Sequence, residues 1–220
     1  MTWNPKPQPF GARLIVVGGQ CSKVGKTALI VDLIRAFPDL VWTAVKLTPH
    51  AESGCPVNGA ACGCKAVEHT FAVREESNAA GTTDTSRFLA AGARRAIWVE
   101  TKEGRVADAL GEVIAHSGRR ADPIVIESNA VAEFWHPDLF LMVLDPRRPD
   151  FKRSAREALD LADAFVFRSA ISVAGQPDRE THALPQKPTF VQFLGQPLPH
   201  DLQTFAEQRI GRRQPNVEPN

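Results

Sequence analysis

Short runs of apolar and β-branched residues alternate with stretches of helical periodicity along most of this 220-residue chain. Several of the runs are almost continuously apolar, which is typical of strands that helices cover on both faces of a parallel sheet. Apolar residues recur at helical spacing in residues 26–37 and 151–162. The runs predicted as strands span residues 13–17, 41–47, 96–100, 123–127, 139–145, 164–168 and 189–193. The alternation predicts an α/β fold of three layers, with a mostly parallel sheet and helices on both of its faces.

The first predicted strand leads directly into the sequence GGQCSKVGKTALI, which starts at Gly18. Its Gly-Lys-Thr ending is that of a phosphate-binding loop, which needs a strand, a turn of small residues and a helix whose first N–H groups face the anion. In such a loop Lys26 reaches the terminal phosphates of a nucleotide and Thr27 supplies a hydroxyl to Mg²⁺. The alternative is a strand–turn–helix connection that contains Gly-Lys-Thr by chance. The residues predicted to bind the nucleotide are Gly19, Cys21, Ser22, Lys23, Val24, Gly25, Lys26, Thr27 and Ala28.

The spacing of this loop departs from the commonest template, because Gln20 stands where the first glycine is expected and Gly19 comes one residue earlier. Residues 19–27 resemble the loop of dethiobiotin synthetase and of the cobyric acid synthase group, in which five residues also separate the glycines. That branch of P-loop proteins also contains the MinD-like ATPases and the nickel-insertion GTPases. The resemblance implies a P-loop NTPase.

The sequence GTTDTSRFLAAGARRAIWVE, residues 81–100, resembles the molybdopterin-guanine dinucleotide biosynthesis adaptor proteins. Together with the end of the second predicted strand, this resemblance covers roughly residues 12–130. It implies that Asp84 faces the metal and phosphate region and that Thr85 supports it. Alternatively, Thr83 or Asp84 is the N-cap of the following helix, and both readings can hold at once.

Two charged residues are expected beside the phosphate loop, at the carboxyl ends of strands, where open α/β sheets bind their ligands. Lys46 ends the second predicted strand and is expected to meet phosphate or substrate, unless it is a solvated strand terminus. Glu127 follows a buried run and is expected to bind Mg²⁺ directly or through water. The candidate catalytic residues are Lys26, Lys46 and Glu127. The candidate Mg²⁺ ligands are Thr27, Asp84 and Glu127.

A Cys- and Gly-rich segment, residues 48–81, follows the second predicted strand and is expected to be an insertion into the domain. Three cysteines within ten residues, flanked by histidines, could surround Zn²⁺ or another soft metal. The candidate ligands are Cys55, Cys62, Cys64, His50 and His69. The alternative is a reduced, metal-free loop with small buried cysteines. Cys21, within the phosphate loop, is either a reactive thiol near a helix N-terminus or a small residue that fits the turn.

The nucleotide is predicted to be ATP or GTP. The Asn-Lys-x-Asp signature of GTPases is missing, because the corresponding strand continues into Arg168-Ser169, and this favours ATP. The related families carry Glu-Gly where Glu127 and Ser128 stand here, so the substrate side is expected to differ. We expect Mg²⁺-dependent nucleotide binding and slow hydrolysis in cofactor or metal-centre assembly, with a partner protein. The alternatives are a dethiobiotin synthetase-like ligase or kinase acting on a small acceptor, and a nucleotide-gated adaptor without turnover.

Charge and hydropathy set the remaining expectations. The formal net charge of +1 gives no electrostatic case for binding nucleic acid or an anionic membrane. No apolar run approaches the roughly 18 residues that cross a bilayer, so we expect a cytoplasmic protein. We also expect a homodimer whose chain forms one nucleotide-binding domain over residues 10–212, with flexible ends at residues 1–9 and 213–220.

Overall fold

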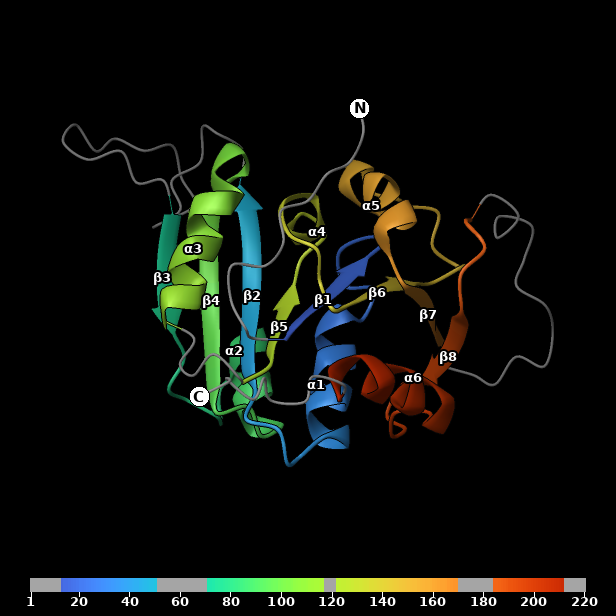
Figure 1. The fold of residues 1–220 in the computed structure, drawn as a ribbon, viewed down its shortest axis with the longest axis horizontal. Helices are drawn as coiled ribbons and strands as arrows, with labels where there is room; N and C mark the ends of the chain where they lie inside the picture. Colours follow the sequence, from blue (N-terminus) through green and yellow to red (C-terminus); the bar gives the residue numbers. More distant parts are fainter. Residues whose placement is uncertain (1–12, 51–70, 117–121, 170–183, 212–220) are drawn as a thin grey trace, which may run out of the picture.

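The computed structural model describes residues 13–50, 71–116, 122–169 and 184–211. Their strands form one eight-stranded sheet in the order β3-β4-β2-β5-β1-β6-β7-β8 (Figure 1). Among these strands only β3, at one edge, runs antiparallel to its neighbour. The strands are β1 (Leu14–Gly19), β2 (Thr43–His50), β3 (Phe71–Glu75), β4 (Arg95–Lys102), β5 (Ile124–Glu127), β6 (Leu139–Leu144), β7 (Ala164–Ser169) and β8 (Thr189–Phe193).

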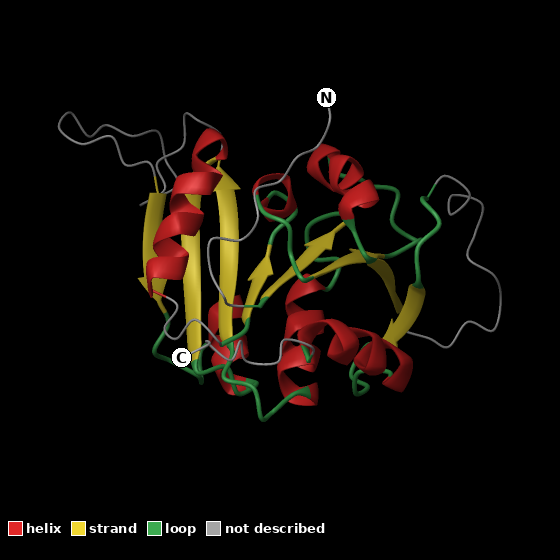
Figure 2. Ribbon diagram, viewed as in Figure 1, coloured by secondary structure: helices red, strands yellow, loops and turns green. Residues whose placement is uncertain are grey.

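Helices cover both faces of this sheet, so the described part of the chain has three layers (Figure 2). One layer contains α1, α2 and α6, and the other contains α3, α4 and α5 (Figure 1). The helices are α1 (Lys26–Ala36), α2 (Asp84–Ala90), α3 (Val106–His116), α4 (Val131–Phe134), α5 (Arg153–Ala158) and α6 (His200–Ile210). The three-layer α/β fold predicted from the alternation is therefore confirmed.

The central strand β1 shows how one strand serves two hydrophobic cores. Ile15 and Val17 pack in the core beneath α1, whereas Leu14 and Val16 pack in the core beneath α3 and α4. Successive side chains of a strand point to opposite faces, and both faces here are covered, so every residue of β1 is buried. This is why the sequence shows a continuous apolar run there and no alternation.

Two parts of the predicted insertion at residues 48–81 are regular strand. β2 continues through Pro49 to His50, where it pairs with Lys102 at the end of β4. The sequence had suggested that Lys46 ends this strand. The structure instead places Lys46 within β2. Residues 71–75 form the edge strand β3, whose Phe71 and Val73 pack into the core beneath α3. Residues 51–70 lie outside the described residues.

Other boundaries also differ from the sequence prediction. The helix expected over residues 151–162 is the short α5 followed by a 3₁₀ turn, Leu159–Leu161. Helices α3 and α6 were not predicted; α6 buries only three of its eleven residues, Leu202, Ala206 and Ile210, among polar neighbours. Within the described residues, none of the helices has the length and apolar character needed to cross a membrane.

Candidate functional site

The predicted phosphate loop is the turn that joins β1 to α1. Gly19 has to be glycine, because a Cβ there would lie 2.7 Å from Val24 Cγ1 and 2.8 Å from Lys26 Cγ. Gln20 has no positive φ, so its backbone does not require glycine. The close approach that calls for the first glycine thus occurs at Gly19, which accounts for the spacing of the motif.

Two residues of this loop have left-handed backbone. Lys23 has φ of 61° and is the only non-glycine residue with positive φ in the described ranges; Gly25 has φ of 109°. Gly25 also lies against Arg168, since a Cβ at position 25 would be 2.4 Å from Arg168 Cδ. Left-handed conformations of non-glycine residues cost energy and cluster at ligand-binding sites, so the backbone of Lys23 makes this turn a candidate binding site.

The first turn of α1 is open to an anion. Gly25 caps the helix without a side-chain hydrogen bond, and the first turn contains no acidic residue. The positive end of an 11-residue helix is thus left without a side-chain acceptor. The Lys26 ammonium reaches back over the turn and donates to the Cys21 carbonyl at 3.2 Å. This is the arrangement of backbone and lysine that a phosphate group requires.

Glu127 lies at the carboxyl end of β5, level with Val17 of β1 and with Lys46 of β2. The Thr27 hydroxyl donates to Glu127 Oε2 at 2.7 Å, and Lys26 Nζ lies 3.8 Å from Oε1. Burial lowers the pKa of Lys26; the Glu127 carboxylate opposes this shift, and the Lys152 and Lys46 ammonium groups add to it. The structure therefore brings together the lysine, the hydroxyl and the acid that the sequence assigned to one site.

Asp84 begins α2 and forms an ion pair with Lys46. Arg87, one turn further along α2, places its Nη1 atom 3.6 Å from Asp84 Oδ1. Thr83 is the N-cap of this helix, and its hydroxyl accepts a hydrogen bond from the Ser86 N–H group at 3.0 Å. The capping role expected for Thr83 or Asp84 thus belongs to Thr83, which leaves the Asp84 carboxylate directed at Lys46.

Glu76 holds the start of α2 in place. Its carboxylate accepts hydrogen bonds from the hydroxyls of Thr83, Thr85 and Ser86 and from the N–H group of Asn78. The backbone hydrogen bond from Asn78, followed by the hydroxyl donors, lowers the pKa of Glu76 to about 2. Thr85 therefore helps to fix the start of α2, the helix that Asp84 begins.

One cavity of about 1040 Å³ is lined by the phosphate loop together with Lys46, Asp84, Arg87 and Glu127. Its basic side chains come from the phosphate loop, β2, α2 and the start of α5: Lys23, Lys26, Lys46, Arg87, Lys152 and Arg153. Its acidic side chains are Asp84, Glu127, Glu133 and Glu157. The cavity therefore extends past the phosphate loop to α4 and α5, a side of the site that the sequence did not predict.

Asn129 and Gln20 are parts of the site whose roles sequence reasoning missed. Asn129 Oδ1 accepts the Gly19 N–H group at 2.7 Å, and its Nδ2 group donates to the Gly19 carbonyl at 3.1 Å. Gly18 leaves room for this contact, because a Cβ there would lie 2.8 Å from Asn129 Oδ1. The only signals in the sequence were Ser128, which stands where the families that the chain resembles carry glycine after Glu127, and the amide side chain of Gln20.

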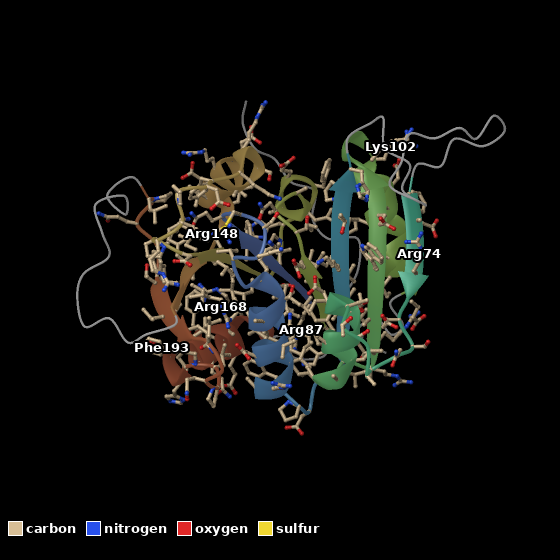
Figure 3. All side chains as sticks on the ribbon, turned by 180° about the vertical axis from the view of Figure 1, so that it is seen from behind. Arg74, Arg87, Lys102, Arg148, Arg168 and Phe193 are labelled. Carbon is tan, nitrogen blue, oxygen red and sulfur yellow. The ribbon has the colours of Figure 1, made fainter. Side chains whose placement is uncertain are left out.

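Arg168 and Arg87 lie on either side of α1 (Figure 3). The Arg168 guanidinium is buried and lies 3.3 Å from Asp32 Oδ2, which also accepts a hydrogen bond from Gln192 Nε2 at 3.1 Å. Burial lowers the pKa of Arg168 in spite of this ion pair. The buried network joins α1 to β7 and β8 directly beneath Gly25, and so supports the phosphate loop from the side opposite to Lys46.

Of the cysteines and histidines that the sequence analysis singled out, the structure describes Cys21 and His50. Cys21 is buried and its pKa is raised, chiefly by burial, so it fits the turn as a small residue and is not an activated thiol. His50 Nε2 lies 3.0 Å from Glu100 Oε1. Within the described ranges, no group of three His, Cys, Asp or Glu side chains is arranged for a metal. The other candidate ligands lie outside the described residues: Cys55, Cys62, Cys64 and His69.

Comparison with known proteins supports the fold. No known family profile matches the chain, and no curated protein sequence matches it. Among solved structures it is similar to HypB from Helicobacter pylori in complex with nickel, with a TM-score of 0.53 and 13% identity over 96% of this chain and 93% of that chain. It also matches LpxK from Aquifex aeolicus in complex with ATP, with a TM-score of 0.49 and 16% identity over 90% of this chain and 62% of that chain. The likeness to HypB shows a P-loop NTPase-like α/β fold.

Proposed function

We propose that this protein binds a nucleoside triphosphate with Mg²⁺ on the β1–α1 loop and hydrolyses it slowly, in the assembly of a cofactor or metal centre. The nucleotide is ATP or GTP, and the missing GTPase signature favours ATP. The proposed unit is a single domain over residues 10–212 that acts as a homodimer in the cytoplasm and meets a partner protein during assembly.

The contact between Thr27 and Glu127 is the observation that carries this proposal. A hydroxyl at the start of α1 and a carboxylate at the end of β5 lie 2.7 Å apart beside Lys26. Hydroxyl and carboxylate oxygens are the hard donors that Mg²⁺ prefers, so these two residues fit the ion, and Asp84 lies on the same cavity wall as Lys46. When bound, Mg²⁺ would neutralise charge on the terminal phosphates. Lys26 and the α1 N–H groups would hold those phosphates.

The link to metal-centre assembly rests on His50 and on the cysteine segment. The Glu100 carboxylate, which is also paired with Arg74, lies at His50 Nε2, so Nδ1 is the nitrogen left for a metal. A carboxylate that orients a histidine in this way is common behind metal ligands. HypB, which has a similar fold, was solved in complex with nickel. We propose that His50 joins a soft-metal site whose other ligands come from Cys55, Cys62, Cys64 and His69.

A second candidate function is transfer of the terminal phosphoryl group to a small acceptor. The extension of the cavity towards α4 and α5 favours it, because Glu133, Ser154 and Glu157 there offer polar groups beyond the phosphate loop. A nucleotide-gated adaptor without turnover is the third candidate, and it requires no such space.

Phosphate release separates these functions. The protein is incubated with ATP or GTP, with and without Mg²⁺, and inorganic phosphate is followed without any added acceptor. Slow release that requires Mg²⁺ supports the proposed hydrolysis. Nucleoside diphosphate that forms only after a metabolite extract is added, without a matching release of inorganic phosphate, supports transfer of the phosphoryl group to an acceptor. Tight nucleotide binding with neither phosphate release nor diphosphate formation under either condition supports the adaptor.

A further inference from the structure

The residue that breaks the usual P-loop spacing is also the residue that holds a second loop in place. Gln20 is buried, and both the oxygen and the nitrogen of its side-chain amide form hydrogen bonds. Its Oε1 atom accepts the Asp145 N–H group at 3.0 Å, and its Nε2 group donates to the carbonyls of Arg148 at 2.8 Å and Asp150 at 3.2 Å. The backbone carbonyl of Gln20 accepts the Lys152 N–H group at 2.9 Å. A glycine at position 20 could make only the last of these four contacts.

These bonds attach the chain between β6 and α5, residues 145–152, to the phosphate loop. We call this segment the β6–α5 loop. A further contact joins the two, because Arg148 Nη1 donates to the Ser22 carbonyl at 3.0 Å. Figure 3 shows Arg148 beside the end of β1, on the side of α1 where Arg168 also lies. The β6–α5 loop and the phosphate loop are therefore placed as one unit.

The last residue of the β6–α5 loop is Lys152, which lines the cavity. Its ammonium is close enough to Lys26 to lower the pKa of Lys26, in addition to the effect of burial. Most basic groups of the cavity are already paired: Lys26 with Glu127, Lys46 and Arg87 with Asp84, and Arg153 with Glu157. Within the described residues, the ammonium groups of Lys152 and Lys23 have no ion-pair or hydrogen-bond partner.

An exposed ammonium held near a second, partly buried ammonium is unfavourable unless an anion lies between them. Lys26 is the group that reaches the terminal phosphates in a loop of this kind. Lys46 lies on the β2 wall of the same cavity, and Lys152 is presented from the β6–α5 side. Three ammonium groups from different elements, those of Lys26, Lys46 and Lys152, thus line the cavity that contains the phosphate loop.

We propose that Lys152 binds the terminal phosphate of the nucleoside triphosphate, and that Gln20 positions it by fixing the β6–α5 loop. This inference rests on the proposed nucleotide binding and adds to it a preference for triphosphate over diphosphate. Gln20 acts through Lys152 and does not itself touch the nucleotide.

Binding of AMPPNP and of ADP, each with Mg²⁺, tests the inference in the full-length protein. Lys152→Ala is expected to weaken AMPPNP binding about tenfold or more, as for the loss of a charge-assisted hydrogen bond, and to leave ADP affinity within about twofold. Lys152→Arg keeps the charge and is expected to recover most of the preference. Arg105→Gln is the control: it removes one positive charge from an exposed residue outside the cavity, and both affinities are expected to stay unchanged.

Gln20→Ala tests the positioning role. It removes no charge, yet it is expected to reduce AMPPNP affinity selectively, and in the double variant with Lys152→Ala the two losses should not add. An unchanged AMPPNP affinity in Lys152→Ala, or an equal loss for AMPPNP and ADP, overturns the role of Lys152. Full additivity in the double variant overturns the role of Gln20. Wild-type protein that binds neither nucleotide would instead refute the proposed function itself.

Discussion

Replacing Glu127 with glutamine removes one charge from the carboxylate that contacts both Thr27 and Lys26 while keeping its shape. The amide oxygen can still accept the 2.7 Å hydrogen bond from Thr27, so the loss is confined to the ion pair with Lys26. The Lys26 ammonium lies 3.8 Å from Glu127 Oε1, and the two side chains are 17% and 9% exposed. At that separation the attraction is about 4 kcal/mol for an effective dielectric constant of roughly 20.

The measurable loss of stability is smaller than this Coulomb energy, because Lys26 can turn towards water once its partner is gone. We expect the free energy of unfolding of Glu127→Gln to fall by about 2 to 3 kcal/mol, and its melting temperature to fall by roughly 4–12 °C. Nucleotide phosphates would give Lys26 a new partner, so ATP without Mg²⁺ should stabilise the variant more than the wild type. Mg²⁺-dependent phosphate release should fall by roughly a hundredfold.

Differential scanning fluorimetry measures the melting temperature and its increase on adding ATP. A phosphate-release assay measures the Mg²⁺-dependent rate. Glu133→Gln is the matched control, because it is the same substitution in the same cavity. Burial and the Glu157 charge already raise the pKa of Glu133, so neutralising it should leave stability unchanged or slightly higher. A Glu127→Gln variant with the melting temperature and Mg²⁺-dependent rate of the wild type would contradict both the ion pair with Lys26 and the role of Glu127 in binding Mg²⁺.

Three further predictions concern the surroundings of the site. Asp84→Asn is expected to lower Mg²⁺-dependent phosphate release about tenfold and to change nucleotide affinity much less; equal losses in rate and affinity would contradict a role in the reaction. Glu76 has a pKa lowered from 4.5 to about 2, so it stabilises the fold above pH 4.5 and loses this effect as the pH falls towards 2. The urea midpoints of the wild type and Glu76→Gln should therefore differ at pH 7 and converge near pH 2, and a constant difference would count against the hydrogen-bonded carboxylate. Elemental analysis after chelator-free purification should find one soft metal per chain, absent when three residues are changed to serine: Cys55, Cys62 and Cys64.

Sequence reasoning succeeded where a local pattern is sufficient. Strands β1, β5 and β6 were predicted to within two residues, because continuous apolar runs are seldom compatible with anything but burial on both faces. The pairing of Val17 with Glu127 then follows from placing the ends of β1 and β5 side by side. A parallel sheet brings these carboxyl ends to one edge, which is why Thr27 and Glu127 could be assigned to one site in advance.

It failed where structure depends on partners far along the chain. The polar end of β2 is a strand because it pairs with β4, about fifty residues later, and the sequence Thr48–Pro49–His50 has no strand signal of its own. The contacts of Gln20 with the β6–α5 loop join groups more than 120 residues apart. From the motif alone, Gln20 is only a departure from a template.

Calorimetric titration of wild-type protein and Lys26→Ala with ATP and with GTP, each in the presence of Mg²⁺, tests directly whether the β1–α1 loop binds a nucleoside triphosphate. The wild type is expected to bind at least one of the two nucleotides at one per chain. Lys26→Ala, with an unchanged circular dichroism spectrum, is expected to lose this binding, because the partly buried ammonium of Lys26 is the group that meets the phosphates. Wild-type protein that binds neither nucleotide, or a Lys26→Ala variant that binds both as tightly as the wild type, would contradict nucleotide binding on this loop.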